Sequence, residues 1–160
     1  MGTPKEMTLA LEKILAPATG HPGESLAGED ESGLNIAVVF TSVESTLVAL
    51  KKAGALASPL GARITLVVPQ CVPYPLPLES PPVLLDFNER RFRSIALESP
   101  VETRVHIYLC RERLELLLMV LKPHSVVVLG GRRRWWRTPE EKLAKRLRRA
   151  GHEVIFMEGA

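Results

Sequence analysis

Short apolar runs alternate with stretches of helical spacing along most of this chain. Runs of four or five residues, rich in branched side chains and bounded by Gly, Pro or Ser, are typical of strands buried on both faces. Their alternation with helices predicts a doubly wound α/β fold, in which helices cover both faces of a five-stranded parallel sheet. The five runs are 36–40, 64–68, 105–109, 126–129 and 154–157.

Four helices are predicted between these runs. Candidate N-caps at 41–45 begin the first helix, and a capping box at Thr138 begins the last. The second and third helices are expected over 83–97 and 111–122, because a proline follows each of them. The faces expected to meet the sheet are Leu47, Leu50, Ala53, Leu56 and Ala57; Leu84, Phe87, Arg91 and Ile95; Leu114, Leu117, Leu118 and Leu121; and Leu143, Leu147 and Ala150.

The proline-rich segment and the third strand each have a sequence pattern that predicts their structure. Six prolines over 69–82 are expected to exclude regular structure and to form a stiff loop, because proline lacks an N–H and has a fixed φ. In the third strand, Arg104, His106 and Tyr108 alternate with apolar residues, which predicts a strand at the sheet edge with one polar face. His106 is therefore expected at the surface, and so is His124, which follows a helix stop.

Length and composition favour one domain. The 160 residues are 46% hydrophobic, which is enough for one real core. Residues 1–33 are rich in Gly and acids and are expected to be a tail or linker, with the domain over 34–160. No run approaches the about 18 apolar residues of a membrane span, and the start lacks the layout of a signal peptide. The expected location is the cytoplasm.

The two cysteines fit that compartment. Cys71 and Cys110 fall just past the ends of the second and third strands and could approach each other. Two reduced thiols are expected, with a redox pair as the alternative. Neither cysteine belongs to a cluster with metal-ligand spacing, so no metal site is expected.

Local sequence also carries a resemblance to a known family. The pieces are Ala49-Leu50, Ala53, Leu56-Ala57, Gly61-Ala62 and 64–68 in the first helix and second strand, and 125–130 in the fourth strand. In this order and with these gaps, they resemble the universal stress protein family across residues 34–158. In that resemblance, 125–130 looks like the family's fourth strand running into its glycine turn, which would place Gly130 and Gly131 in the turn. The resemblance implies the strand order 3-2-1-4-5 and dimers that commonly pair through the last strand.

The chain departs from the ATP-binding members of that family. Those members end the first strand with Asp and carry G-x-x-G-x9-G-[ST] after the fourth. Here Thr41 replaces the Asp, Arg133 replaces the second glycine, and Leu143-Ala144 replace the last pair. A side chain at these positions blocks the approach of backbone N–H groups to phosphate. The resemblance is therefore to a divergent member that lacks the usual ATP-binding motif.

A ligand site is still expected where the strands end, because open α/β sheets bind ligands at the carboxyl ends of their strands. A capped helix start and arginines that fork onto phosphate favour ATP, AMP or another phosphorylated molecule. The candidate ligand-binding residues are Thr41, Ser42, Gly130, Gly131, Arg132, Arg133, Arg134, Arg137 and Thr138.

Trp135 and Trp136 stand in a polar loop among arginines. Leaving both rings in water is unfavourable, so they are expected to cover the end of the domain or to contact a partner, while most of the arginines are solvated. Residues 132–149 also carry nine bases, which would suit nucleic acid. No nucleic-acid motif is present, and this ranks as the last alternative.

The remaining expectations concern assembly and activity. Val154, Ile155, Phe156 and Met157 form a nearly uncharged terminal strand, whose edge is expected to pair with its copy in a homodimer. No phosphate loop or nucleophile turn of an enzyme is present. The chain is therefore expected to be a non-catalytic, stress-related binding or regulatory module, which could also bind a protein partner.

Overall fold

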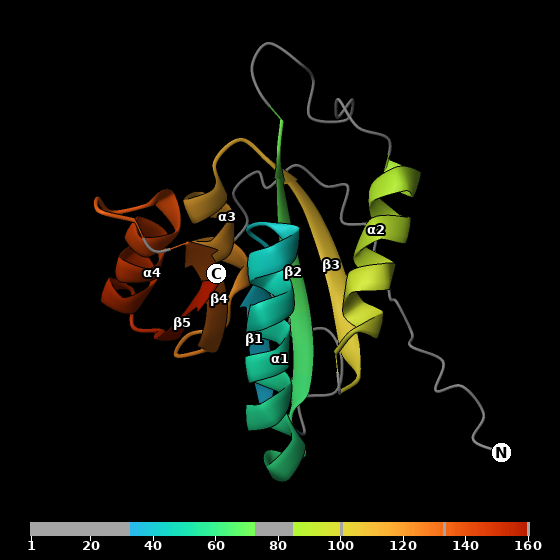
Figure 1. Ribbon diagram of the computed structural model, residues 1–160. Helices are drawn as coiled ribbons and strands as arrows, with labels where there is room; N and C mark the ends of the chain where they lie inside the picture. Colours follow the sequence, from blue (N-terminus) through green and yellow to red (C-terminus); the bar gives the residue numbers. More distant parts are fainter. Residues whose placement is uncertain (1–32, 73–84, 100, 133, 160) are drawn as a thin grey trace, which may run out of the picture.

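The protein forms a three-layer α/β domain with a parallel sheet in the middle (Figure 1). The computed structural model describes residues 33–72, 85–99, 101–132 and 134–159. The sheet order is β3-β2-β1-β4-β5, and every neighbouring pair is parallel, so the predicted fold and strand order are confirmed. The elements are β1 (Asn35–Val39), α1 (Val43–Leu60), β2 (Arg63–Cys71), α2 (Leu85–Leu97), β3 (Thr103–Cys110), α3 (Arg113–Val120), β4 (Val126–Arg132), α4 (Pro139–Arg149) and β5 (Glu153–Gly159).

Helices cover both faces of the sheet, and successive strand residues face opposite helices. In β1, Ile36 and Val38 pack in the core under α1 and α2, whereas Ala37 and Val39 pack in the core under α3 and α4. This alternation explains why the run is apolar at every position. The expected tail over 1–33 lies outside the described residues apart from Gly33, and so does most of the proline-rich segment.

The second strand is longer than predicted, because it continues through Pro69 to Cys71. The N–H of Phe40 donates to the carbonyl of Val67, so Val67 and, two residues on, Pro69 direct their backbone groups toward β1. β1 ends at Val39, so no residue of β1 pairs with Pro69. The N–H that proline lacks would point to this unpaired side, and the sheet loses no hydrogen bond. The expectation of a loop was therefore wrong for 69–71, because a proline whose missing N–H needs no partner fits at the end of a strand.

β3 lies at the sheet edge as predicted, but its expected polar face is wrong. His106 and Tyr108 are buried, and Tyr108 packs in the core under α3 and α4. A helix covers this face even at the edge, so the alternation of residue types did not mark a solvated side. His124, by contrast, is exposed as expected.

Several predicted helix faces are shifted by a residue or more. In α3 the buried residues are Leu116, Leu117 and Val120, whereas Leu118 is exposed. In α2, Phe92 is buried and Arg91 is exposed. The α3 sequence is apolar nearly all round, so its periodicity could not choose a face; Ala150, expected to face the sheet, is also exposed.

The ends of α1 and α4 follow the predicted signals. Gly61 ends α1 in the left-handed conformation, with φ of 61°, after Pro59 in the last turn. Thr138 caps α4, with Pro139 at its first position. No helix in the described parts of the chain is both long and apolar enough to cross a membrane.

His152 follows α4 in the chain and accepts a hydrogen bond from the residue before β4. This contact predicts that the stability of the protein depends on pH. The Nδ1 of His152 accepts a hydrogen bond from the Ser125 N–H at 3.2 Å, which requires an unprotonated Nδ1. Burial, with a smaller contribution from His124, lowers the pKa of His152 below its ordinary value of 6.5. The unfolded state then binds protons first, so the free energy of unfolding should fall as pH falls through about 6.5. Urea unfolding of the parent and of His152→Gln across this range measures the effect, and an equal slope in both proteins would contradict it.

Candidate functional site

A cleft of about 520 Å³ opens at the carboxyl ends of β1 and β4. α1 leaves the end of β1 over one face of the sheet, and α4 follows β4 over the other, so a crevice forms between the two exits. The described residues that line it are Thr41, Ser42, Val43, Glu44, Ser45, Arg91, Gly131, Arg132, Arg134, Trp136, Arg137, Thr138, Pro139 and Glu140.

Most of the candidate ligand-binding residues meet in this cleft. Thr41 and Ser42 reach it from β1, and Gly131, Arg132, Arg134, Arg137 and Thr138 reach it from β4 and the segment that follows. Gly130 does not line the cleft, and Arg133 lies outside the described residues. Trp136, expected at an interface, also lines the cleft.

The two glycines have a packing role that the sequence did not reveal. They were expected in a turn after β4, but they are part of the strand, where Gly130 pairs with Met157 and Gly131 pairs with Glu158. A Cβ on Gly130 would lie 2.3 Å from the Ser45 backbone oxygen. A Cβ on Gly131 would lie 2.7 Å from Phe156 Cζ. The glycines therefore let α1 and β5 pack closely against β4.

Three hydroxyl groups at the cleft already hold the local structure. The Thr41 hydroxyl donates to the Gly130 carbonyl oxygen at 2.7 Å, which ties the end of β1 to β4. Ser42 Oγ accepts from the Ser45 N–H, and Thr138 Oγ1 accepts from the Glu141 N–H. The last two are N-caps, so these residues position two helix starts beside the cleft. These residues therefore shape the cleft by holding the local backbone.

Two helix N-termini therefore face one cleft. α1 contributes Ser42, Val43 and Glu44, and α4 contributes Thr138 and Glu140. Each helix has the positive end of its dipole here, and an anion placed between them would be stabilised by both. The effect is strongest within the first turn, which is the part that lines the cleft.

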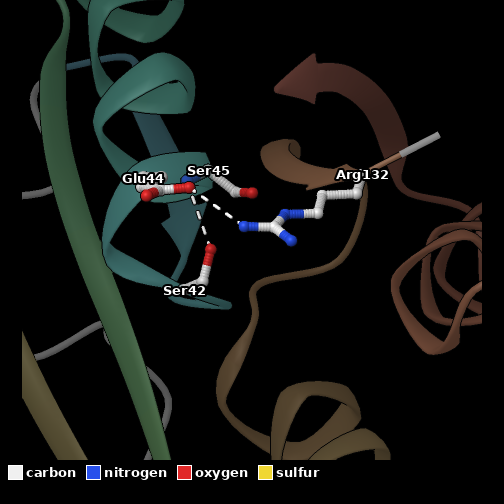
Figure 2. Close-up of polar contacts among 4 residues, drawn as sticks. All are labelled: Ser42, Glu44, Ser45 and Arg132. Carbon is white, nitrogen blue, oxygen red and sulfur yellow. Dashed lines mark hydrogen bonds and ion pairs between the residues drawn. The ribbon is translucent and has the colours of Figure 1, made fainter. Parts of the chain in front are cut away.

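The side chains add an excess of positive charge. Four arginines and two glutamates line the cleft. Arg132 Nη2 lies 3.2 Å from Glu44 Oε2, and Figure 2 shows this contact reaching from the end of β4 to the first turn of α1. Both side chains are largely exposed, 60% and 73%, so the pair is weak and can open when an anion competes for the guanidinium.

Two charged residues of the cleft were missed in the sequence. Arg91 lies on α2, far along the chain from the arginines after β4, and was interpreted as part of an apolar face. Glu44 was seen only as part of a helix start. The charged middle of α2 was the available signal for Arg91, but only the tertiary structure brings α2 beside α1.

Core residues take the place of the last pair of the glycine motif that the ATP-binding members carry. Leu143 and Ala144, which take the place of the last pair of the motif, are buried on the sheet side of α4. They pack with Leu147 and do not line the cleft. A phosphate cannot be gripped by backbone at these positions, so arginines and helix starts are the remaining donors.

The two cysteines lie at the carboxyl ends of β2 and β3 and do not line the cleft. Cys71 pairs with Cys110 across β2 and β3, and their Sγ atoms are 3.6 Å apart. Both are free thiols, and burial, followed by the neighbouring Cys71, raises the pKa of Cys110 to about 12. Among the described residues, no group of three or more His, Cys, Asp or Glu is placed to hold a metal ion.

The tryptophans and β5 provide the candidate contact surfaces. Trp135 is fully exposed and Trp136 is 70% exposed, so neither covers the end of the described domain. In β5, Val154 and Phe156 pack under α4, whereas Ile155 and Met157 pack on the α1 face. Val154 is buried and the other three side chains are partly buried in the protein's own core, and the backbone edge of β5 is left for pairing with another strand.

The comparisons with known proteins agree with this architecture. No protein-family model matches the sequence, and no curated protein matches it. The structure is similar to a universal stress protein from Archaeoglobus fulgidus, with a TM-score of 0.55 and 16% identity over 78% of this chain and 93% of that chain. A universal stress protein in complex with cAMP is similar with a TM-score of 0.49 and 15% identity, over 80% of this chain and 98% of that chain. The predicted resemblance is confirmed for the fold, which is that of the universal stress proteins.

Proposed function

We propose that this protein is a cytoplasmic, non-catalytic binding module of the universal stress protein type, whose cleft holds a phosphorylated ligand, with an adenine nucleotide as the first candidate. The observation that carries the proposal is the meeting of two helix N-termini and four arginines in one cleft of about 520 Å³. This volume is in the range of small-molecule pockets. The charge and the dipoles together favour a ligand with one or more phosphates.

The lining also supports a role in binding rather than catalysis. Among the described residues of the cleft, none is His, Cys, Asp or Lys, and the two glutamates oppose a phosphate electrostatically. The hydroxyls of Ser42 and Thr138 serve as helix caps, which leaves them unsuited as activated nucleophiles. The described lining therefore favours binding of an anion, and Glu44 and Glu140 are the carboxylates in it that could serve as a general base.

Calorimetry with ATP and AMP tests the nucleotide site. Arg137→Ala should weaken binding about tenfold or more, because a hydrogen bond to a charged group is lost. Glu44→Gln should strengthen binding, since it removes a negative charge from the cleft and releases Arg132. The two substitutions should change nucleotide affinity in opposite directions, which is a stricter test than a loss of affinity in one variant.

Arg63→Ala is the matched control. Arg63 is exposed at the first residue of β2. It therefore lies at the amino ends of the strands, whereas the cleft lies at their carboxyl ends, and nucleotide affinity should not change. Absence of binding of both nucleotides at millimolar concentration would remove the nucleotide assignment. Equal losses in Arg63→Ala and Arg137→Ala would show that only the overall charge matters.

Homodimer formation through β5 is the second part of the proposal. β5 is an edge strand, and an edge presents backbone groups that can pair with another strand. Arg148 Nη2 donates to the outward carbonyl of Val154 at 3.0 Å and would have to move aside in such a dimer. Light scattering after size-exclusion chromatography should show a dimer at micromolar concentration, and Arg148→Ala should not weaken it. A strict monomer in both proteins would contradict this part alone.

A further inference from the structure

Exposed aromatic and basic residues lie in the segment between β4 and α4 and on α4 itself, and some of them line the cleft. We define the Trp–Arg surface as Arg134, Trp135, Trp136, Lys142, Lys145 and Arg149, all of which are exposed. Trp135 lies outside the cleft lining, whereas Trp136 is part of it. Trp135 is fully exposed and Trp136 is 70% exposed, and two neighbouring exposed indoles leave a large apolar area in water, which is typical of a contact surface.

The basic residues of α4 form one continuous outer stripe. Leu143, Ala144 and Leu147 face the sheet, so Lys142, Lys145 and Arg149 fall on the opposite side of the helix. Their spacing of three and four residues places them in a row about 10 Å long. The row begins at Lys142 in the first half of α4, which follows the two tryptophans in the chain, and the two acidic residues of α4 are both in its first turn.

This combination of groups distinguishes between partners. Single-stranded nucleic acid offers phosphates to a row of cations and open base faces to aromatic rings, and it uses both features of the surface. A duplex hides its base faces, and an acidic protein would need apolar side chains beside its carboxylates to cover the indoles. An anionic membrane could also take Trp and Arg, but Trp136 belongs to a concave, charged cleft that a flat bilayer surface cannot enter.

We propose that the Trp–Arg surface binds single-stranded nucleic acid. Bases stack on Trp135 and Trp136, and the backbone phosphates lie along Lys142, Lys145 and Arg149. The strand reaches the cleft through Trp136, so this inference extends the proposed phosphate site. Its outer part, formed by Trp135 and α4, is independent of that site.

Fluorescence anisotropy with a short labelled oligouridylate tests the proposal on the full chain. Binding should be measurable at low salt and should weaken steeply between about 50 and 200 mM salt. Trp135→Ala should weaken it about tenfold, because a stacked base is lost. The double change Lys142→Ala with Lys145→Ala should also weaken it and should flatten the salt dependence.

Controls separate this site from the nucleotide cleft. Lys51→Ala with Lys52→Ala removes two exposed charges from α1, on the other face of the sheet, and should leave oligonucleotide affinity unchanged. Trp135→Ala should leave ATP affinity unchanged, because Trp135 does not line the cleft. If ATP binds and the oligonucleotide does not, the proposed function stands and this inference fails.

Three further outcomes would overturn the inference. They are equal affinity for a duplex and a single strand, no effect of Trp135→Ala in a protein whose circular dichroism is unchanged, and binding to phosphatidylserine vesicles without binding to the oligonucleotide.

Discussion

Replacement of Gly130 by Ala should destabilise the protein by about 3 kcal/mol, because the new methyl group meets backbone rather than a movable side chain. The Cβ would lie 2.3 Å from the Ser45 oxygen and 2.9 Å from its carbonyl carbon. To make room, the first turn of α1 must move away from β4. Urea unfolding gives the loss in free energy, and the melting temperature should fall by roughly 6–12 °C.

Gly33 and Gly131 provide the controls for this prediction. A Cβ on Gly33 meets nothing within 4 Å, so Gly33→Ala should change stability by less than about 0.5 kcal/mol. Gly131→Ala should fall between the two, since its closest neighbour is the Phe156 ring, which can shift. Equal stability of Gly130→Ala and Gly33→Ala would show that β4 and α1 are not packed as described.

Leu117→Ala should cost about 2–5 kcal/mol, the range for removing a large side chain from a core. Leu117 is 0% exposed and packs between α3 and the sheet with the other residues under α3 and α4. The next residue, Leu118, is 45% exposed, and Leu118→Ala should cost less than about 0.5 kcal/mol. Chemical unfolding of both variants measures this difference between two adjacent leucines.

The pair also tests the helix face that the sequence could not assign. Both leucines were expected to face the sheet, because the α3 sequence offers apolar residues in nearly every direction. If Leu118→Ala is the more damaging change, α3 is rotated about its axis relative to the structure. Similar losses from both changes would indicate that Leu118 is covered, for example by another protein chain.

Local sequence predicted the candidate site in part. Thr41, Ser42 and the arginines after β4 were identified because they follow apolar runs, and parallel strands bring their carboxyl ends to one edge. Arg91 was not identified, since its contribution depends on how α2 packs beside α1. The expected turn at Gly130 and Gly131 was wrong because β5 extends far enough to pair with both glycines.

The sequence by itself determined the α/β class, a helix start within 41–45 and another at Thr138, and the cluster of charge after β4. Each of these depends on residues close together in the chain, through hydrophobic period, capping chemistry or composition. Only the tertiary structure decided that both helix starts open onto one cleft, that His106 is buried at a sheet edge, and that Gly130 must be a glycine. These features depend on contacts between segments far apart in sequence, and no local pattern specifies which distant backbone or helix will lie opposite a given residue.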